Sequence, residues 1–276
     1  IRFPSKVYWG AGSIKALRDI VSYTRATHIA LFTDAVLRAA GTVDGVIENL
    51  TGTGLPLLIR DNLATEPSYP EFKTLCEDLL SQDIDIIIAV GGGSVMAQAK
   101  LTAAAMRNPA FLENVKDTSL LINQPVPIVA VPTTAGTGAE ASANAILFFP
   151  EEELKVGIVH EKLLPPFVVL DPVLTQKMPP SLTASTGVDA RCHALESLIS
   201  KKSNGMCELY ARESLRLIAQ YLKRAYDNGA DEEARCGMLL AAFYAGVCLA
   251  TSSTVAVHAL SYPLGGKYHI PHGVAN

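Results

Sequence analysis

The sequence predicts an α/β domain with a mostly parallel sheet over residues 1–180, followed by an all-helical domain over residues 181–276. Two observations lead to this prediction. In the first part, short apolar runs alternate with segments of helical periodicity, which is the pattern of parallel strands connected by helices. After Asp171-Pro172 the apolar runs stop and only helical patterns follow. We therefore place the boundary near residues 178–180, which read Met-Pro-Pro.

The predicted strands are short apolar runs, several of which end in a polar residue or in glycines. They are Ile29–Thr33, Leu57–Ile59, Asp85–Val90, Pro127–Val131 and Phe167–Leu170. Between them, Pro70–Gln82 has helical spacing and Ser94–Met106 is rich in alanine, so both are predicted helices. Sheets of this kind bind ligands at the carboxyl ends of their strands, where Asp34, Gly91–Ser94 and Thr133–Gly138 are expected.

The second part contains two long helical patterns. Glu208–Ala225 has its apolar residues on one face, whereas Asp231–Ala250 is apolar on most faces, which predicts a buried helix. Its most apolar stretch, Met238–Ala250, is too short and too rich in alanine to span a bilayer.

Composition and charge narrow the range of functions. The 276 residues are 49% hydrophobic and 18% charged, which predicts a large core and little disorder. The net charge is −4 and no run of Lys or Arg occurs, so we expect neither nucleic acid nor a membrane as a partner. Five scattered cysteines without a C-x-x-C pair are typical of a reduced protein, and we expect a cytoplasmic location.

Two pairs of residues indicate a metal site in the helical part. Asp189 and His193 are four positions apart, which places both on one face of a helix. His258 ends an apolar stretch, and Pro263 with the two glycines after it predicts a helix break that brings His272 back towards His258. One carboxylate and three imidazoles suit a divalent Fe, Zn, Co or Mn ion.

Each pair alone has a simpler explanation. An Asp-x3-His pair is often structural, and a histidine in an apolar helix, such as His258, is often a hydrogen-bonded core residue. The metal interpretation gains weight because helix breakers separate the second pair and because loops suited to a nucleotide precede both pairs.

The glycine loop, Gly91–Ser94, follows a predicted strand and precedes a predicted helix. Free N–H groups and the positive end of the helix dipole at Gly92, Gly93 and Ser94 suit a phosphate. The alternative is a tight turn in which Ser94 is the N-cap of the helix. The loop does not match the G-x-G-x-x-G pattern of a standard dinucleotide site.

The threonine loop, Thr133–Gly138, follows another predicted strand. Its Thr133 and Thr134 suit contacts to a ribose or phosphate, but for this loop taken alone a hydroxyl-rich turn that caps the next segment is the favoured explanation. Asp34 ends the first predicted strand, where a carboxylate can bind a ribose diol and so favour NAD over NADP. The alternative for Asp34 is an N-cap of a helix at Ala35–Ala40.

Three further charged residues, Glu140, Lys155 and Glu196, are candidates for the metal and cofactor site. Glu196 lies on the same predicted helix as His193 and is placed to orient a metal ligand. For Glu196, as for Glu140 and Lys155, spacing alone favours a solvated charge or a surface ion pair.

Taken together, these stretches resemble the iron-containing (group III) alcohol dehydrogenase family over essentially the whole chain. The motifs that carry the resemblance are VYWGAGS (Val7–Ser13), FTD (Phe32–Asp34), GGGSVMAQAK (Gly91–Lys100), PTTAGTGAE (Pro132–Glu140), LDP (Leu170–Pro172), TGVDARCHALE (Thr186–Glu196) and HALSYPLGGKYHIPHG (His258–Gly273). The resemblance implies a dehydroquinate synthase-like fold, with a dinucleotide-binding α/β domain and a helical metal-binding domain. Since family members usually continue for about a hundred residues more, we expect this sequence to be part of a longer chain.

The resemblance also implies roles for individual residues. The metal ligands are Asp189, His193, His258 and His272, and the cofactor-binding residues are Asp34, Gly92, Gly93, Ser94, Thr133 and Thr134. Lys155 matches a lysine commonly found near the cofactor. The candidates for catalysis are His258, Lys155, Tyr262, which stands where many members have a proton-relay histidine, and His269 as a nearby substitute. His269 is otherwise expected to be an exposed loop histidine.

Two positions depart from the family pattern. Ala97 stands where the glycine-loop motif usually carries Asp, so Ser94 lacks a capping-box partner and a polar group near the nucleotide is lost. Tyr262 titrates near 10 in its unperturbed state, which makes it a poor general base at neutral pH.

We therefore expect a metal-dependent, NAD(P)-linked alcohol dehydrogenase or aldehyde reductase with a small alcohol or aldehyde as substrate. The expected metal is Fe²⁺, with Zn²⁺ or another divalent ion also compatible, the expected cofactor is NAD, with NADP also compatible, and the expected assembly is a homodimer. The alternatives are a glycerol dehydrogenase, a dehydroquinate synthase-like lyase, a metallohydrolase, or a metal-binding homologue of reduced activity.

Overall fold

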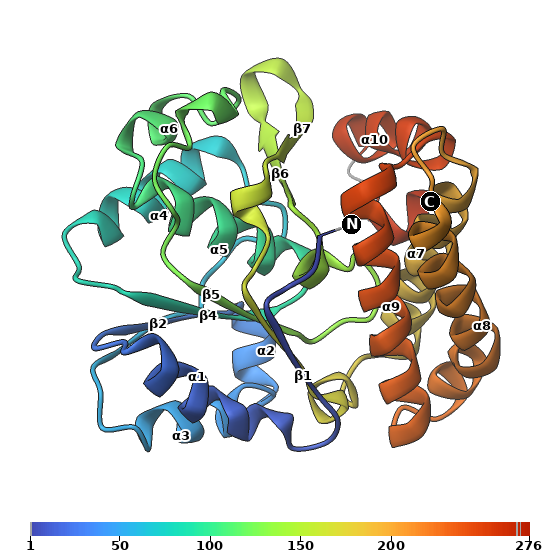
Figure 1. Cartoon of the computed structure of the whole chain (residues 1–276), viewed down its shortest axis with the longest axis horizontal. Helices are drawn as coiled ribbons and strands as arrows, with labels where there is room; N and C mark the ends of the chain where they lie inside the picture. The colour runs from blue at the N-terminus through green and yellow to red at the C-terminus, as the bar shows by residue number, and fades with distance from the viewer. Residues whose placement is uncertain (1, 269, 271) are drawn as a thin grey trace.

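The computed structural model of the chain describes residues 2–268, 270 and 272–276, apart from the side chains of residues 262 and 264–266. Its first part is built on a six-stranded sheet with the order β1-β8-β5-β4-β2-β3 (Figure 1). The strands are β1 (Lys6–Trp9), β2 (Ile29–Phe32), β3 (Leu57–Arg60), β4 (Ile86–Gly91), β5 (Ile128–Pro132) and β8 (Phe167–Leu170). Every neighbouring pair is parallel, as the alternation of strands and helices predicts.

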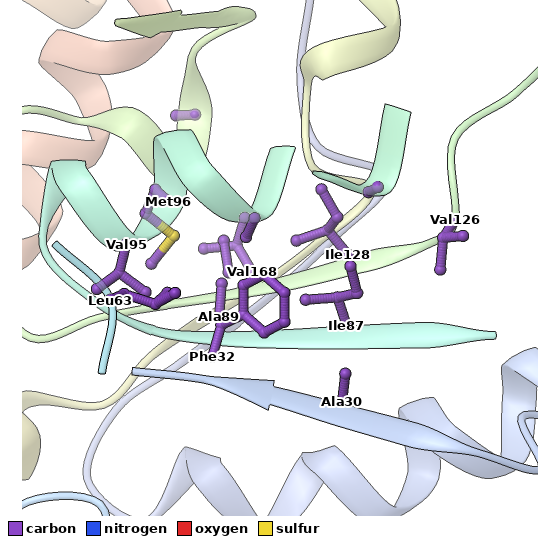
Figure 2. Close-up of a cluster of buried hydrophobic side chains, with 14 of the residues drawn as sticks. Ala30, Phe32, Leu63, Ile87, Ala89, Val95, Met96, Val126, Ile128 and Val168 are labelled. Carbon is purple, nitrogen blue, oxygen red and sulfur yellow. The ribbon is translucent and has the colours of Figure 1, made fainter. Parts of the chain in front are cut away.

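Helices cover both faces of this sheet. They are α1 (Ala16–Thr24), α2 (Ala35–Ala39), α3 (Asp44–Thr51), α4 (Tyr69–Leu80), α5 (Gly93–Ala105) and α6 (Pro109–Glu113). On one face, Ile87 and Ala89 of β4 pack with Val95 and Met96 of α5 (Figure 2). On the other face, the alternate β4 residues pack with α1 and α3. The central strands are apolar throughout because both of their faces are buried.

Two pieces of β-structure were not predicted from the sequence. The strands β6 (Asn144–Phe149) and β7 (Leu154–Val159) form an antiparallel hairpin beside the main sheet. The side chains of β6 alternate between buried and partly buried, and β7 is mostly exposed, so neither is a continuous apolar run. The strand β1 is a four-residue edge strand that pairs only with β8.

The second part is helical over the residues that the structure describes. Its helices are α7 (Pro180–Ile199), α8 (Gly205–Asp227), α9 (Glu232–Ser252), α10 (Ala256–Tyr268) and α11 (His272–Ala275). They stand together at one side of the sheet (Figure 1). α9 connects the two parts, because Phe243 and Val247 join the core cluster of the sheet while Leu239 joins that of the helices.

α9 is also the one described helix that is long and apolar enough to cross a membrane. However, 67% of its most apolar window is buried against the rest of the protein, as expected for the central helix of a folded core. The predicted fold class is confirmed, and the patterns at 208–225 and 231–250 correspond to α8 and α9. α7 begins at Pro180, at the proposed boundary, and the division into two domains stays a prediction.

Candidate metal centre and cofactor loops

α7 supplies two of the four predicted metal ligands. Asp189, His193 and Glu196 are spaced by four and three residues, so one face of the helix carries all three. All three side chains are buried, with 2–4% of their residue surface exposed. A buried polar row on a helix requires partners in the protein or a bound ligand.

α10 and α11 supply the other two ligands, by a route different from the predicted one. The break lies before His258 rather than after it, because α9 ends at Ser252 and Ser253 has a φ of 71°, outside the helical region. α10 then runs through Pro263 to Tyr268, so the predicted break at Pro263 is wrong. A helix can continue past a proline when packing supports it, at the loss of one backbone hydrogen bond. α10 ends at Tyr268, α11 begins at His272, and the two helices are in contact.

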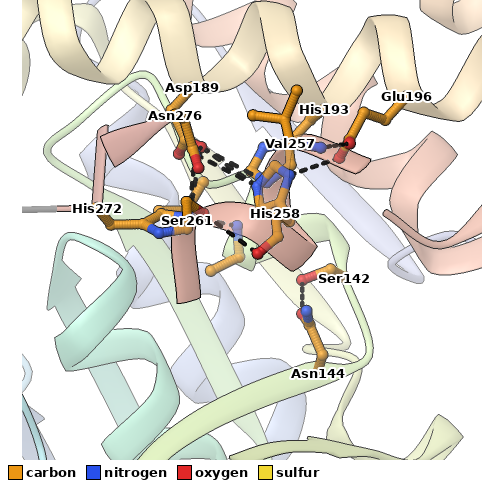
Figure 3. Close-up of polar contacts among 12 residues, drawn as sticks. Ser142, Asn144, Asp189, His193, Glu196, Val257, His258, Ser261, His272 and Asn276 are labelled. Carbon is orange, nitrogen blue, oxygen red and sulfur yellow. Dashed lines mark hydrogen bonds and ion pairs between the residues drawn. The ribbon is translucent and has the colours of Figure 1, made fainter. Parts of the chain in front are cut away.

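The four predicted ligands converge (Figure 3). One ligand atom from each of Asp189, His193, His258 and His272 lies within 4.8 Å of the others. Oδ1 of Asp189 is 3.7 Å from Nε2 of His193 and 3.6 Å from Nε2 of both His258 and His272. Ligands about 2.1 Å from a shared ion in tetrahedral geometry would be about 3.4 Å apart, so the separations suit a small divalent cation.

The contacts of Asn276 show that the space between the four predicted ligands favours positive charge. Its Nδ2 lies 2.6 Å from Oδ1 of Asp189, 3.4 Å from Nε2 of His258 and 3.3 Å from Nε2 of His272. An amide N–H group carries partial positive charge, and here it is surrounded by acceptor atoms. The same acceptors therefore provide a donor set for a cation, and the residues fit the predicted metal.

The surroundings favour the metal-binding forms of Asp189, His193 and His272, but not that of His258. Burial alone would raise the pKa of Asp189, but the three histidines outweigh it and lower this pKa to about 2. Burial lowers the pKa of His193 and of His272, which keeps both imidazoles neutral. For His258, burial is outweighed by hydrogen bonds to Asp189 and Glu196, and its pKa is raised. An ionised carboxylate and neutral imidazoles are the forms that bind metal.

Glu196 holds the beginning of α10. Its Oε2 lies 2.6 Å from Nδ1 of His258, and its Oε1 accepts the N–H of Val257 at 2.5 Å. The carboxylate thus turns Nε2 of His258 towards Asp189 and satisfies an N–H group in the first turn of α10. The alternative of a solvated charge is wrong for Glu196, since the residue is 2% exposed.

The glycine loop and the threonine loop lie together at the carboxyl ends of β4 and β5. The N–H of Thr133 donates to the carbonyl of Gly91 at 3.1 Å. A Cβ atom added to Gly92 would lie 3.4 Å from Oγ1 of Thr134, so the two loops are in contact. α5 begins at Gly93, and its N-cap, Gly92, has no side-chain cap. A helix start of this kind suits an anion.

The N-cap alternative for Ser94 is wrong, and its role in phosphate binding stays a prediction. Ser94 is the second residue of α5 and not the N-cap, so the capping-box argument built on Ala97 is wrong. Its hydroxyl donates to the carbonyl of Thr65, in the loop before α4. Ala97 is buried in an apolar cluster that includes Phe72 and Leu101, and the loss of a polar group near the nucleotide stays a prediction.

Asp34 is a helix cap in this structure. Its Oδ1 accepts the N–H of Leu37 at 2.9 Å, which is the N-cap alternative, and the ribose role stays a prediction. Lys155 of β7 forms an ion pair with Glu66, which was the alternative to a role beside the cofactor. The side chain of Tyr262 and the whole of His269 lie outside the described residues.

The expected solvated charge or surface ion pair at Glu140 is wrong, and Lys100 is a buried charge that the sequence motifs do not assign. Both are buried, at 2% and 1% exposure. Nζ of Lys100 donates to the carbonyls of Ser142 at 2.7 Å and Asn144 at 2.9 Å. The sequence does hint at the burial of Lys100, because this lysine lies in an alanine-rich helix. A lysine in such a helix, which is buried from Val95 onward, must find partners inside the protein.

Comparison with known proteins identifies this arrangement. Residues 4–172 match the family described as iron-containing alcohol dehydrogenase, and residues 183–276 match the C-terminal part of the same family. The chain belongs to the iron-containing alcohol dehydrogenase family.

Individual members of this family match over nearly the whole chain. It is 34% identical to long-chain-alcohol dehydrogenase 1 of Geobacillus thermodenitrificans (strain NG80-2), over 100% of this chain and 70% of that protein. It is 30% identical to the NAD-dependent methanol dehydrogenase of Bacillus methanolicus, over 97% of this chain and 70% of that protein. The crystal structure of 1,3-propanediol oxidoreductase matches with a TM-score of 0.94 at 33% identity, over 99% of this chain and 72% of that one.

These matches confirm the predicted family, the predicted class of enzyme and the predicted cofactors. The chain is an iron-type, NAD-linked oxidoreductase that acts on CH–OH groups, so its substrates are alcohols or aldehydes. The lyase and hydrolase alternatives are not favoured by any of them.

Proposed function

We propose that Asp189, His193, His258 and His272 hold the iron ion of an alcohol dehydrogenase, and that NAD binds across the glycine and threonine loops. The observation that carries the proposal is the convergence of four ligand atoms within 4.8 Å at the junction of α7, α10 and α11. The helix start at Gly93, with the threonine loop in contact beside it, supports the cofactor position.

The bound cofactors supply the reactive chemistry: the ion polarises the substrate oxygen as a Lewis acid, and the nicotinamide takes or gives the hydride. The chain supplies charge, orientation and a dry site. Asp189 stays ionised because the histidines hold its pKa at about 2, and it balances part of the positive charge. Glu196 orients His258 through Nδ1. The burial of Asp189, His193 and His258 excludes water from the ligand side.

Proton transfer, the remaining requirement, is proposed for Tyr262 or His269, both on the segment between His258 and His272. Lys155 is proposed to lie beside the cofactor, because it matches a lysine commonly found there in the family. We further propose that the protein is a homodimer. We also propose a cytoplasmic location, because all five cysteines are free.

The test is an assay of the purified full-length protein with a series of small aldehydes, using NADH and NADPH in parallel. The same sample is analysed for bound metals. We expect NADH oxidation that depends on about one equivalent of iron or another divalent ion per chain. Turnover that persists after the metal has been removed by a chelator would contradict the proposed centre.

A further inference from the structure

The threonine loop lies between the sheet half of the site and the metal-bearing helices. On the sheet side it contacts the glycine loop at two points. A Cβ atom on Gly92 would lie 3.4 Å from Thr134, and one on Gly93 would lie 2.8 Å from Cγ2 of Thr137. The first residue of the loop continues the β5 ladder through its bond to Gly91.

On the helical side the same loop meets backbone atoms rather than flexible side chains. A Cβ atom on Gly136 would lie 2.7 Å from Cβ and 2.9 Å from the carbonyl oxygen of Thr186 in α7. A Cβ atom on Gly138 would lie 2.5 Å from Cα of Gly246 and 2.7 Å from the carbonyl oxygen of Ala242, both in α9. Gly138 also has a φ of +58°, which favours glycine.

The contact between Gly138 and Gly246 is mutual. A Cβ atom on Gly246 would lie 2.8 Å from Cα of Gly138 and closer still to its carbonyl oxygen. Neither chain segment can take even a methyl group without moving apart. The helix residue on the other contact, Thr186, is three positions before the metal ligand Asp189.

We propose that Gly136, Gly138 and Gly246 are positioning residues that set the distance between the bound nicotinamide and the metal ligands. This inference rests on the proposed function, since it assumes that the cofactor lies on the threonine loop and the metal lies between α7, α10 and α11. The three glycines permit backbone-to-backbone contact, so the loop that orients the cofactor is fixed directly against the helices that carry or support the ligands.

The size of the expected effect follows from the distances. Carbon atoms in contact prefer separations of about 3.5–4.0 Å, so a methyl group at Gly246 would move the loop and α9 apart by about 1 Å. A misplacement of about 1 Å between reacting groups can lower a rate by about 100-fold. The metal ligands themselves and the phosphate-binding helix start would remain intact.

The experiment compares Gly246→Ala with Gly237→Ala in the metal-loaded, full-length enzyme. The control lies on the same helix and has an equally close neighbour, because a Cβ atom on Gly237 would lie 2.5 Å from Cε2 of Tyr221. That neighbour is an aromatic side chain on α8, whereas the close neighbours of Gly246 are backbone atoms of the threonine loop. Both variants therefore strain α9, but only Gly246→Ala pushes on the loop.

We expect kcat of Gly246→Ala to fall about 10- to 100-fold, with metal content unchanged and the Kd for NADH within about threefold of wild type. The deuterium isotope effect on kcat, measured with NADH labelled at C4, should rise because hydride transfer becomes slower than product release. Gly237→Ala should change none of these quantities beyond its effect on Tm. Equal kcat losses in the two variants, or an unchanged isotope effect, would overturn the proposal.

Two further measurements test the proposal if the Gly246→Ala protein fails to fold. Gly136→Ala pushes the loop away from α7 instead of α9 and should likewise lower kcat and raise the isotope effect. Because the Gly136 backbone also hydrogen-bonds His193, these values are compared per bound metal ion. In the wild-type protein, amide hydrogen exchange of the threonine loop should be as slow as that of α9, and rapid exchange of the loop would contradict a fixed contact. Wild-type turnover and metal dependence are measured in the same series, so failure of the proposed function is seen separately.

Discussion

In the sheet half of the site, the groups offered to a ligand are largely backbone atoms of two short loops, whereas in the helical half they are side chains from three helices. The glycine loop and the threonine loop follow β4 and β5 directly, and their residues are neighbours in sequence. The proposed metal ligands span residues 189 to 272 and meet because α10 and α11 pack against α7.

The comparison shows how each half responds to change. A backbone site tolerates most side-chain substitutions, provided that the backbone keeps its place, and its weak points are the glycines in close contact. A side-chain site loses function when any one ligand is removed, because the remaining ligands are too few and their charges are left buried without a partner. The predictions below test this difference, from the largest expected effect to the smallest.

Removal of a single metal ligand should have the largest effect. For His258→Ala or His272→Ala, we expect loss of bound metal and a fall in turnover of about 1,000-fold or more, since Lewis-acid stabilisation is worth several kcal/mol. Binding of NADH should persist, because the loops proposed to bind it are untouched. Metal analysis, turnover and NADH fluorescence titration check this, with His28→Ala as the control. A ligand variant that keeps one metal ion per chain would contradict the proposed metal centre.

Loss of the carboxylate behind His258 should have a smaller effect. In Glu196→Ala, Nδ1 of His258 and the N–H of Val257 both lose their acceptor, and metal affinity should fall about 10- to 100-fold. Glu196→Gln keeps one acceptor oxygen and should lose less. Competition with a metal-binding dye measures the affinity, and Glu208→Ala, which changes an exposed carboxylate on α8, serves as the control. Equal affinity in all three variants would mean that Glu196 serves only to cap α10.

The titration of the buried Glu140 side chain should appear in the pH dependence of stability. Burial raises the pKa of Glu140 to about 7, although the positive charge of Lys100 opposes this. The folded protein therefore keeps a proton on Glu140 up to about pH 7, while the unfolded chain releases it near its usual pKa of 4.5. Between these values stability falls as pH rises, by at most about 1.4 kcal/mol per pH unit.

Glu140→Gln removes this titration. Between about pH 4.5 and pH 7, the free energy of unfolding of the wild type should fall relative to that of Glu140→Gln as pH rises. Urea unfolding at several pH values measures the difference, in metal-free protein so that metal release does not contribute. Parallel curves for the two proteins would show that Glu140 is ionised in the folded state.

The ion pair between Lys155 and Glu66 should have the smallest effect on stability. Both side chains are partly exposed, and such pairs contribute about 0–1 kcal/mol. Lys155→Ala should therefore shift the free energy of unfolding by less than about 1 kcal/mol. If Lys155 lies beside the cofactor, as proposed, the same variant should raise KM for NADH several-fold. Lys223→Ala, which breaks an exposed ion pair on α8, should leave KM unchanged.

The main strands and the long helices could be predicted because their signals are local. Central strands such as β4 are apolar throughout, and α8 has a clear amphipathic period. The β6–β7 hairpin escaped prediction because its half-buried strands carry a weaker pattern. The helix break was misplaced because Pro263 is a strong local signal, whereas the turn at Ser253 depends on how α10 packs.

For the site, the sequence by itself determined which residue types were available and their local spacing. The four-residue interval between Asp189 and His193 fixes a shared helix face, because helix geometry depends only on the chain. Gly91–Ser94 likewise predicts a helix start with free N–H groups. Such features follow from covalent geometry and short-range hydrogen bonding.

The tertiary structure alone decided which of these residues meet. It brought His258 and His272 to α7, placed Glu196 and Glu140 inside the protein instead of in solvent, and set Gly138 against Gly246. The reason is physical: burial, partner distance and backbone contact arise from packing between segments distant in sequence, and packing has no fixed period along the chain.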